Sequence, residues 1–190
     1  MMFYLLLGVL LWSFAHLFKR VFPDLRKMLD DTLGNWSKIV FAVPLVASVV
    51  LMVMGYRGNT APILYQSPDW MVHINNTLML LAVTFFGVGN SKSHARQWFR
   101  HPQLYGFISW AVAHLLVNGD LASILLFGGL LIWAIAEIVL INRQETGVTR
   151  YSGGSLKGDL RLLGISIVVY LVIIGLHIWA GVWPLPVTGT

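Results

Sequence analysis

The chain has no cysteine and few charged side chains. The lack of cysteine excludes disulfides, thiolate metal ligands, a cysteine nucleophile and the covalent attachment of a c-type haem. Charged residues make up 11% of the 190 residues, whereas soluble domains average about 25%. Hydrophobic residues reach 57%, and the mean hydropathy is +0.73. Because the few charges are gathered between long apolar runs, we expect lipid to be the solvent for most of the chain.

Six apolar segments are each close to the roughly 17–25 residues with which a helix crosses a bilayer. We place them at residues 3–17, 39–55, 72–89, 103–117, 121–141 and 162–182. Only helices and closed barrels satisfy their backbone hydrogen bonds in lipid, and these runs are too long and continuous for barrel strands. The first segment lacks a basic start and a small-residue cleavage site, so we expect a retained helix rather than a signal peptide. The sequence therefore predicts an all-α integral membrane protein, a bundle of six transmembrane helices that forms a single domain over residues 1–190.

The basic residues predict which side of the membrane each loop faces. Twelve of the 13 lysines and arginines lie in the first, third and fifth loops, and only Arg57 lies on the opposite side. The twelve are Lys19, Arg20, Arg26, Lys27, Lys38, Lys92, Arg96, Arg100, Arg143, Arg150, Lys157 and Arg161. Lysine and arginine concentrate in cytoplasmic loops, so both termini are expected in the periplasm of a bacterial inner membrane. This distribution accounts for the net charge of +5 without a nucleic-acid partner.

Two apolar segments, "GVLLWSFAHLF" at 8–18 and "GFISWAVAHLL" at 106–116, share the pattern Gly-x-x-x-Trp-x-x-Ala-His-Leu. In the predicted topology the two segments run antiparallel. Three helices followed by three more would then form a 3+3 inverted repeat, an architecture known among membrane proteins. The other interpretation is coincidence, because glycine, tryptophan, alanine and leucine are all common in membrane helices.

The histidine of each copy, His16 and His114, lies inside an apolar span, where an ionisable side chain by default indicates a functional site. Neutral imidazole is a common ligand of haem iron. Trp12 and Trp110 lie four residues before these histidines, on the same helix face. Gly8 and Gly106 lie four positions earlier again on the same face. A small residue, a tryptophan and a histidine on one face could make room for a flat macrocycle. The alternative is that each histidine donates a hydrogen bond to a nearby carbonyl and does nothing more.

Other polar residues in or near the spans also have two interpretations. His73 opens the third span and His101 opens the fourth, and each is either a further ligand or a polar residue at the headgroups. His177 is either a ligand or a packed histidine, and His94, in a basic loop, is expected to be solvated. Glu137 is the only acid in a predicted span. It is either an interfacial charge that snorkels to the headgroups or a functional group, as a partner of Arg100 or a proton relay.

Four stretches together resemble the NnrU family: "FAHLFKR", "MVHINNTLMLLA", "RHPQLYGFISWAVAHLLVNGD" and "LASILLFGGLLIWA". These are bacterial inner-membrane proteins linked to denitrification, and they are similar to the plant 15-cis-zeta-carotene isomerase. The resemblance extends from Met1 to about Arg143. It implies a redox, sensor or helper role in nitrite and nitric oxide metabolism, with a membrane redox partner or a nitrite or nitric oxide reductase as the partner. Whether the chain is an enzyme stays open.

The resemblance also implies a haem b. The positions that match the axial ligands of the isomerase are His16 and His114, and His73 and His101 belong to the same set of family histidines. The isomerase is thought to need a cysteine three residues before the fourth-helix histidine, and here that position is Ala111. This difference weakens the inference of carotene isomerisation and leaves haem ligation by two histidines intact.

Three alternatives remain at this stage. The first is a haem-dependent cis-trans isomerase of a polyene. The second is a two-haem transmembrane electron carrier, because by depth His16 would pair with His101 and His73 with His114. The third is a membrane methyltransferase of the isoprenylcysteine type, whose inner-face motif resembles "RHPQLYG". The acidic run and the spacing of that enzyme class are missing here, and binding of S-adenosylmethionine without haem would favour it.

Overall fold

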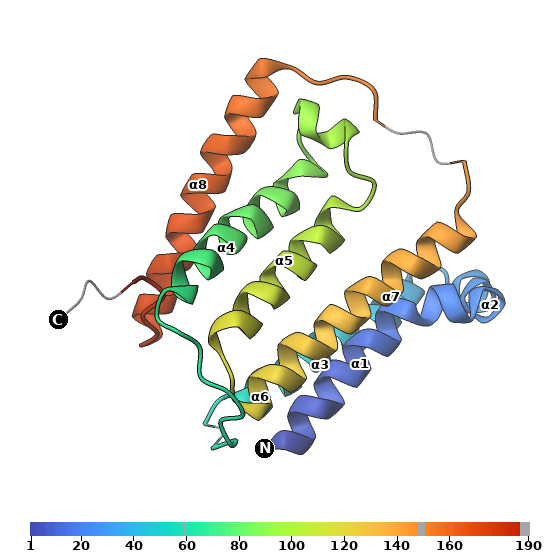
Figure 1. Ribbon diagram of the computed structural model, residues 1–190. Coiled ribbons are helices and arrows are strands. Elements are labelled where there is room, and N and C mark those ends of the chain that lie inside the picture. Colours follow the sequence, from blue (N-terminus) through green and yellow to red (C-terminus); the bar gives the residue numbers. More distant parts are fainter. Residues whose placement is uncertain (59, 148–150, 187–190) are drawn as a thin grey trace. The chain divides into compact units, whose positions relative to one another are not determined.

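The computed structural model describes residues 1–58, 60–147 and 151–186, and Arg150 lies outside them. Regular structure in these ranges is helical apart from one isolated antiparallel bridge between Ile63 and Asp120. The helices are α1 (Met2–Val21), α2 (Pro23–Leu33), α3 (Trp36–Tyr56), α4 (Met71–Val88), η1 (His94–Gln97), α5 (Pro102–Val117), α6 (Leu121–Ser123), η2 (Ile124–Gly128), α7 (Gly129–Gln144) and α8 (Leu156–Trp179) (Figure 1). The segment η2 is a π-helix that continues α6 into α7. The all-helical prediction is confirmed.

Five of these helices are long and apolar enough to cross a membrane. They are α1, α3, α4, the continuous helix Leu121–Gln144 and α8. The α5 helix has 16 residues, which at about 1.5 Å per residue is shorter than a hydrocarbon core of about 30 Å. The structure thus supports a multi-pass membrane protein. A sixth crossing, the periplasmic termini and the inverted repeat stay predictions.

The largest difference between a predicted and an observed helix start is at α8, where a polar side chain caps the helix. The last helix begins at Leu156, six residues before the predicted start, because the Ser155 hydroxyl accepts a hydrogen bond from the Gly158 N–H at 3.1 Å. Such a cap satisfies one of the free N–H groups in the first turn of a helix. The same helix ends at Trp179 rather than at residue 182.

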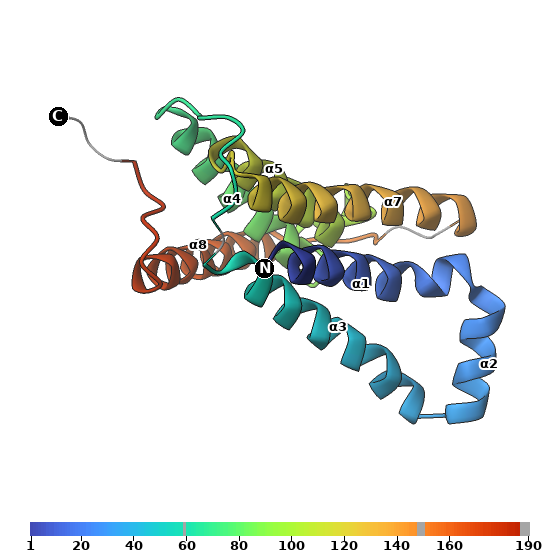
Figure 2. The same ribbon diagram turned by 90° about the horizontal axis from the view of Figure 1, so that it is seen from below.

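The chain folds as two compact units. Among the described residues, one unit comprises Met1–Leu64 and Asp120–Thr146, and the other comprises Tyr65–Gly119, Gly147 and residues 151–186. In the first unit α1 packs between α3 and α7, as Figure 2 shows. In the second unit α4 packs against both α5 and α8 (Figure 1). The helices of the repeated motif thus differ in setting, since α1 is the central helix of its unit and α5 is not.

Glycines lie where the helices within each unit approach most closely. A Cβ added at Gly8 would come within 2.8 Å of the Ser48 carbonyl oxygen of α3. One added at Gly106 would come within 3.1 Å of the Ala82 carbonyl oxygen of α4. Small residues permit such contacts between membrane helices. The expectation that these glycines make room for a macrocycle is therefore wrong, because the neighbouring helix fills the space.

The α1–α3 contact offers a direct test of this packing. A Cβ at Gly55 would come within 2.7 Å of the Leu5 Cα. Since the Leu5 atoms in contact belong to a helix backbone, they cannot move aside as a side chain could. Gly55→Ala is therefore expected to destabilise the first unit by about 1–3 kcal/mol. Thermal unfolding in detergent measures the loss. The matched control is Gly164→Ala in α8, where an added Cβ meets no atom within 4 Å, and an equal loss in both variants would contradict the assignment.

Candidate functional site

In the first unit, His16 belongs to a cluster of three aromatic rings. Its ring centroid lies 4.2 Å from that of Trp12 and 4.8 Å from that of Trp133, and the two indoles are 5.4 Å apart. Trp133 comes from α7, and it was not among the predicted site residues although it lies in the quoted stretch "LASILLFGGLLIWA". Two indoles beside one imidazole restrict how that ring can turn.

A single hydrogen bond fixes the tautomer of His16. Its Nδ1 lies 3.0 Å from the Trp12 carbonyl oxygen. Because a carbonyl only accepts, Nδ1 carries the proton and donates it, and Nε2 keeps its lone pair. Metal-bound histidines commonly use their second nitrogen in this way, which raises the basicity of the ligating nitrogen. A hydrogen bond from the histidine to a carbonyl was the alternative to metal ligation. This hydrogen bond is in fact compatible with ligation through Nε2.

The second copy of the motif repeats this local arrangement in α5. The Nδ1 of His114 lies 2.9 Å from the Trp110 carbonyl oxygen, and the two rings are 5.2 Å apart. Both histidines are half-buried. In both segments the imidazole thus binds the backbone carbonyl four residues earlier and takes the same tautomer.

The loop before α4 holds the end of α5 that carries His114. The Tyr65 hydroxyl donates to the carbonyls of Leu115 and Asn118, and the Ser67 hydroxyl donates to that of Leu116. The last carbonyls of a helix lack intrahelical partners, so these side chains replace the missing hydrogen bonds. They anchor the last turn of α5.

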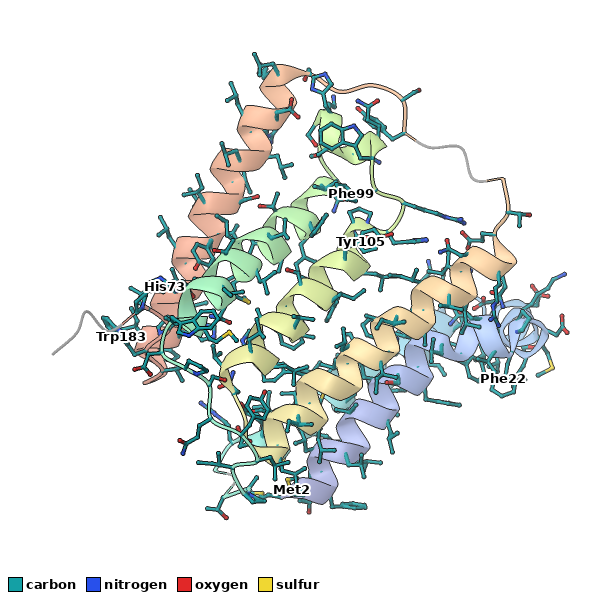
Figure 3. The ribbon with its side chains drawn as sticks, in the orientation of Figure 1. Met2, Phe22, His73, Phe99, Tyr105 and Trp183 are labelled. Atoms are coloured by element: carbon teal, nitrogen blue, oxygen red, sulfur yellow. The ribbon has the colours of Figure 1, made fainter. Side chains whose placement is uncertain are left out.

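Helix register brings three histidines of the second unit to similar depth. The Ser109 hydroxyl donates to the Leu78 carbonyl at 2.8 Å, and a Cβ at Gly87 would meet Leu162 at 2.7 Å. The first contact sets the register of α5 against α4, and the second sets that of α8 against α4. Counted from these contacts along the antiparallel helices, His114 of α5 and His177 of α8 fall within about one turn of the start of α4. His73 lies at that start, where Figure 3 labels it. His177 forms the same bond as the other two, with Nδ1 2.8 Å from the Ile173 carbonyl oxygen.

His101 lies at the other end of α5. It directly precedes Pro102, the first residue of the helix. Thirteen residues separate it from His114, which corresponds to about 20 Å along a helix. His101 and His114 are therefore too far apart to ligate the same metal ion.

His94 is exposed, as expected, but it is also paired. Its Nδ1 lies 2.6 Å from Oδ2 of Asp159, and its backbone N–H donates to the other carboxylate oxygen at 2.8 Å. The bidentate contact joins the loop after α4 to the first turns of α8. The expectation of a merely solvated histidine is corrected by this pair.

Glu137 is buried rather than interfacial. Its side chain is 8% exposed, and its Oε1 lies 3.7 Å from Nε of Arg20 in α1. Arg20 also donates to Glu145 Oε1 at 2.6 Å. The interpretation of Glu137 as a charge that snorkels to the headgroups is therefore wrong. Arg20 and Glu137 each lie four residues after a member of the aromatic cluster, His16 and Trp133 respectively.

The described side chains offer separate histidines rather than a cluster of metal ligands. Within the described ranges, no three histidine, aspartate or glutamate side chains gather as the ligands of a metal ion. A haem needs only one imidazole on each face, because the macrocycle supplies the other ligands. His16 in the first unit and His114 in the second each hold Nδ1 at a carbonyl, so each has the tautomer that a haem ligand needs.

Comparison with known proteins bears on the whole chain. No curated protein and no solved structure matches it. The sequence profile described as NnrU protein matches residues 4–184, which extends the resemblance found in the motifs beyond Arg143 through the last helix. This chain therefore belongs to the NnrU family.

Proposed function

We propose that this chain is a haem b protein of the bacterial inner membrane, in which His16 and His114 would hold the iron. One observation carries the proposal. In both copies of the motif the imidazole donates its Nδ1–H to the carbonyl four residues earlier, at 3.0 Å and 2.9 Å. Iron binds a neutral imidazole through the other nitrogen, so both histidines are held in the required tautomer. When bound, haem b would supply one-electron redox chemistry.

The surrounding side chains have roles that follow from their positions. Trp12 and Trp133 flank the His16 ring and limit its rotation. Trp110 lies beside the His114 ring in the same way. The carbonyl bonds raise the basicity of both Nε2 atoms, and they favour the neutral imidazoles as ligands. Since the chain has no cysteine, this arrangement supports redox or sensing chemistry more than cysteine-dependent isomerisation of a polyene.

The first experiment is a visible absorbance spectrum of the detergent-purified protein, oxidised and then reduced with dithionite, with haem quantified per chain. We expect a sharp reduced α-band, because two imidazoles give a low-spin iron, and one haem per chain. Protein that stays colourless when it is expressed with ample haem would disprove the proposal.

The biological role follows from the family. We infer that the chain supports nitrite or nitric oxide reduction as a redox carrier, a sensor or a helper of the reductase. Deletion of its gene is the test. A helper role predicts that reductase activity is lost while the purified protein itself converts no nitrite or nitric oxide.

One observation favours a second candidate, the two-haem electron carrier. The α4–α5 register places His73 and His114 at similar depth within the second unit. One haem would use these two histidines, and a second haem would use other histidines at another depth. Haem quantification separates the two proposals, because the carrier requires two haems per chain.

A further inference from the structure

The buried carboxyl of Glu137 is only partly satisfied by its surroundings. Its Oε2 is buried and, among the described residues, accepts no hydrogen bond. The Nε of Arg20 faces Oε1 at 3.7 Å, beyond hydrogen-bond distance, and this Nε is likewise buried without a hydrogen-bond acceptor. Burial of a carboxylate without full hydrogen bonding is costly. Small changes in the surrounding charges can thus change whether this carboxyl is ionised.

The charged groups around Glu137 come from α1 and from the end of α7. From α1, Lys19 and Arg20 face it. Arg20 is shared, because its Nη1 donates to Glu145 at 2.6 Å while its Nε only approaches Glu137. The Gln144 amide donates to the Arg20 carbonyl at 2.6 Å and holds this end of α1 against α7. Of the two cations, Arg20 is the one at a measured contact distance from Glu137, and the more exposed Glu145 engages it more closely.

The position of Glu137 relates it to the proposed ligand. Trp133 contacts His16, and one helical turn further on, in both helices, Glu137 faces Arg20. One turn is about 5.4 Å. The step from the aromatic cluster to Glu137 and Arg20 leads toward the basic first and fifth loops, which the charge distribution predicts to be cytoplasmic. The side chain of Glu145, which Arg20 also contacts, is 44% exposed.

We infer that Glu137 Oε2 takes up one proton from the cytoplasmic side when the iron held by His16 gains one electron. This inference rests on the proposed haem function. The electron comes from a one-electron donor, a reduced mediator dye in the test below, and the proton comes from water. An added electron removes one positive charge from the site, which disfavours an ionised carboxylate nearby in a medium of low dielectric constant. The only bond that forms is the carboxyl O–H.

The test is a redox titration of the purified holoprotein over a range of pH, followed at the reduced α-band. For coupled uptake of one proton, the midpoint potential of the unchanged chain falls by up to about 59 mV per pH unit. Glu137→Gln is expected to abolish that slope and to keep the haem content. Glu145→Gln is the matched control, because it removes an exposed carboxyl beside the same arginine and is expected to keep the slope.

A second variant keeps the test decisive if Glu137→Gln folds poorly. Arg20→Gln removes the cation that favours the ionised carboxyl, so the pH range over which the potential varies is expected to move upward. A pH-independent potential in the unchanged chain, or a Glu137→Gln variant that keeps the slope, overturns the inference and leaves haem binding intact. A colourless preparation overturns the proposed function together with the inference.

Discussion

Replacement of His114 by alanine is expected to yield protein that has lost its haem and its reduced α-band. The substitution removes one axial nitrogen and leaves the Trp110 carbonyl without its Nδ1–H donor. Loss of a side chain that only supports a ligand costs about 10–100-fold in metal affinity, so we expect loss of the ligand itself to cost more. His16→Ala is expected to have the same effect, because it removes the other axial nitrogen. Haem per chain and the reduced spectrum measure both results.

His177→Ala is the matched control for this experiment. His177 has the same Nδ1 bond to a carbonyl, at 2.8 Å, and lies at similar depth in the second unit. If general disturbance of a buried imidazole were the cause of haem loss, His177→Ala would also lose haem. Full occupancy in His177→Ala, with none in His16→Ala and His114→Ala, supports the ligand assignment. Retention of haem in His16→Ala would show that His114 has a different axial partner.

The part of the site that lies within single helices could be predicted from the sequence. Because a helix returns to the same face after four residues, the spacing of Trp12 and His16, repeated in Trp110 and His114, was enough to predict a tryptophan beside each imidazole. The rings are 4.2 Å and 5.2 Å apart. The alternative bond from each histidine to a backbone carbonyl was also correct, and the structure adds that the carbonyl belongs to the tryptophan.

The part of the site that depends on which helices meet could not be predicted. In soluble proteins an apolar stripe shows which face of a helix packs, but lipid is as apolar as a leucine side chain, so every face of a membrane helix looks alike. For this reason the sequence did not indicate that Trp133 would contact His16, or that Arg20 would face Glu137. The closest signal was glycine, and we assigned Gly8 and Gly106 to a macrocycle rather than to helix contacts.

The start of α8 shows a second limit. The predicted span began at residue 162 because Lys157, Asp159 and Arg161 looked too polar for a membrane helix. Charged residues in the first turns of a helix can lie at the membrane surface and remain hydrated. Here Asp159 also binds His94 of the preceding loop. Hydropathy therefore located the apolar part of the helix, whereas capping by Ser155 determined where the helix begins.

Replacement of Gly119 by alanine is expected to destabilise the second unit by about 3 kcal/mol, the upper end for an overpacked site. An added Cβ would overlap the Tyr65 carbonyl oxygen and come within 2.8 Å of its carbonyl carbon. It would also displace the Tyr65 N–H from the Gly119 carbonyl, 3.2 Å away. Because Tyr65 and Ser67 hold the last turn of α5, the displacement reaches the turn that carries His114.

Two comparisons separate this effect from a general intolerance of substitution. Gly175→Ala in α8 places a Cβ in open space, so its unfolding temperature should equal or slightly exceed that of the unchanged chain, since alanine favours a helix. Tyr65→Phe removes the hydroxyl with its bonds to Leu115 and Asn118 and keeps the ring, and it should cost about 1 kcal/mol. We therefore expect the unfolding temperature and the haem content to be highest in Gly175→Ala, lower in Tyr65→Phe and lowest in Gly119→Ala. A Gly119→Ala variant as stable as Tyr65→Phe would show that the loop can move aside, and that the last turn of α5 does not depend on its position.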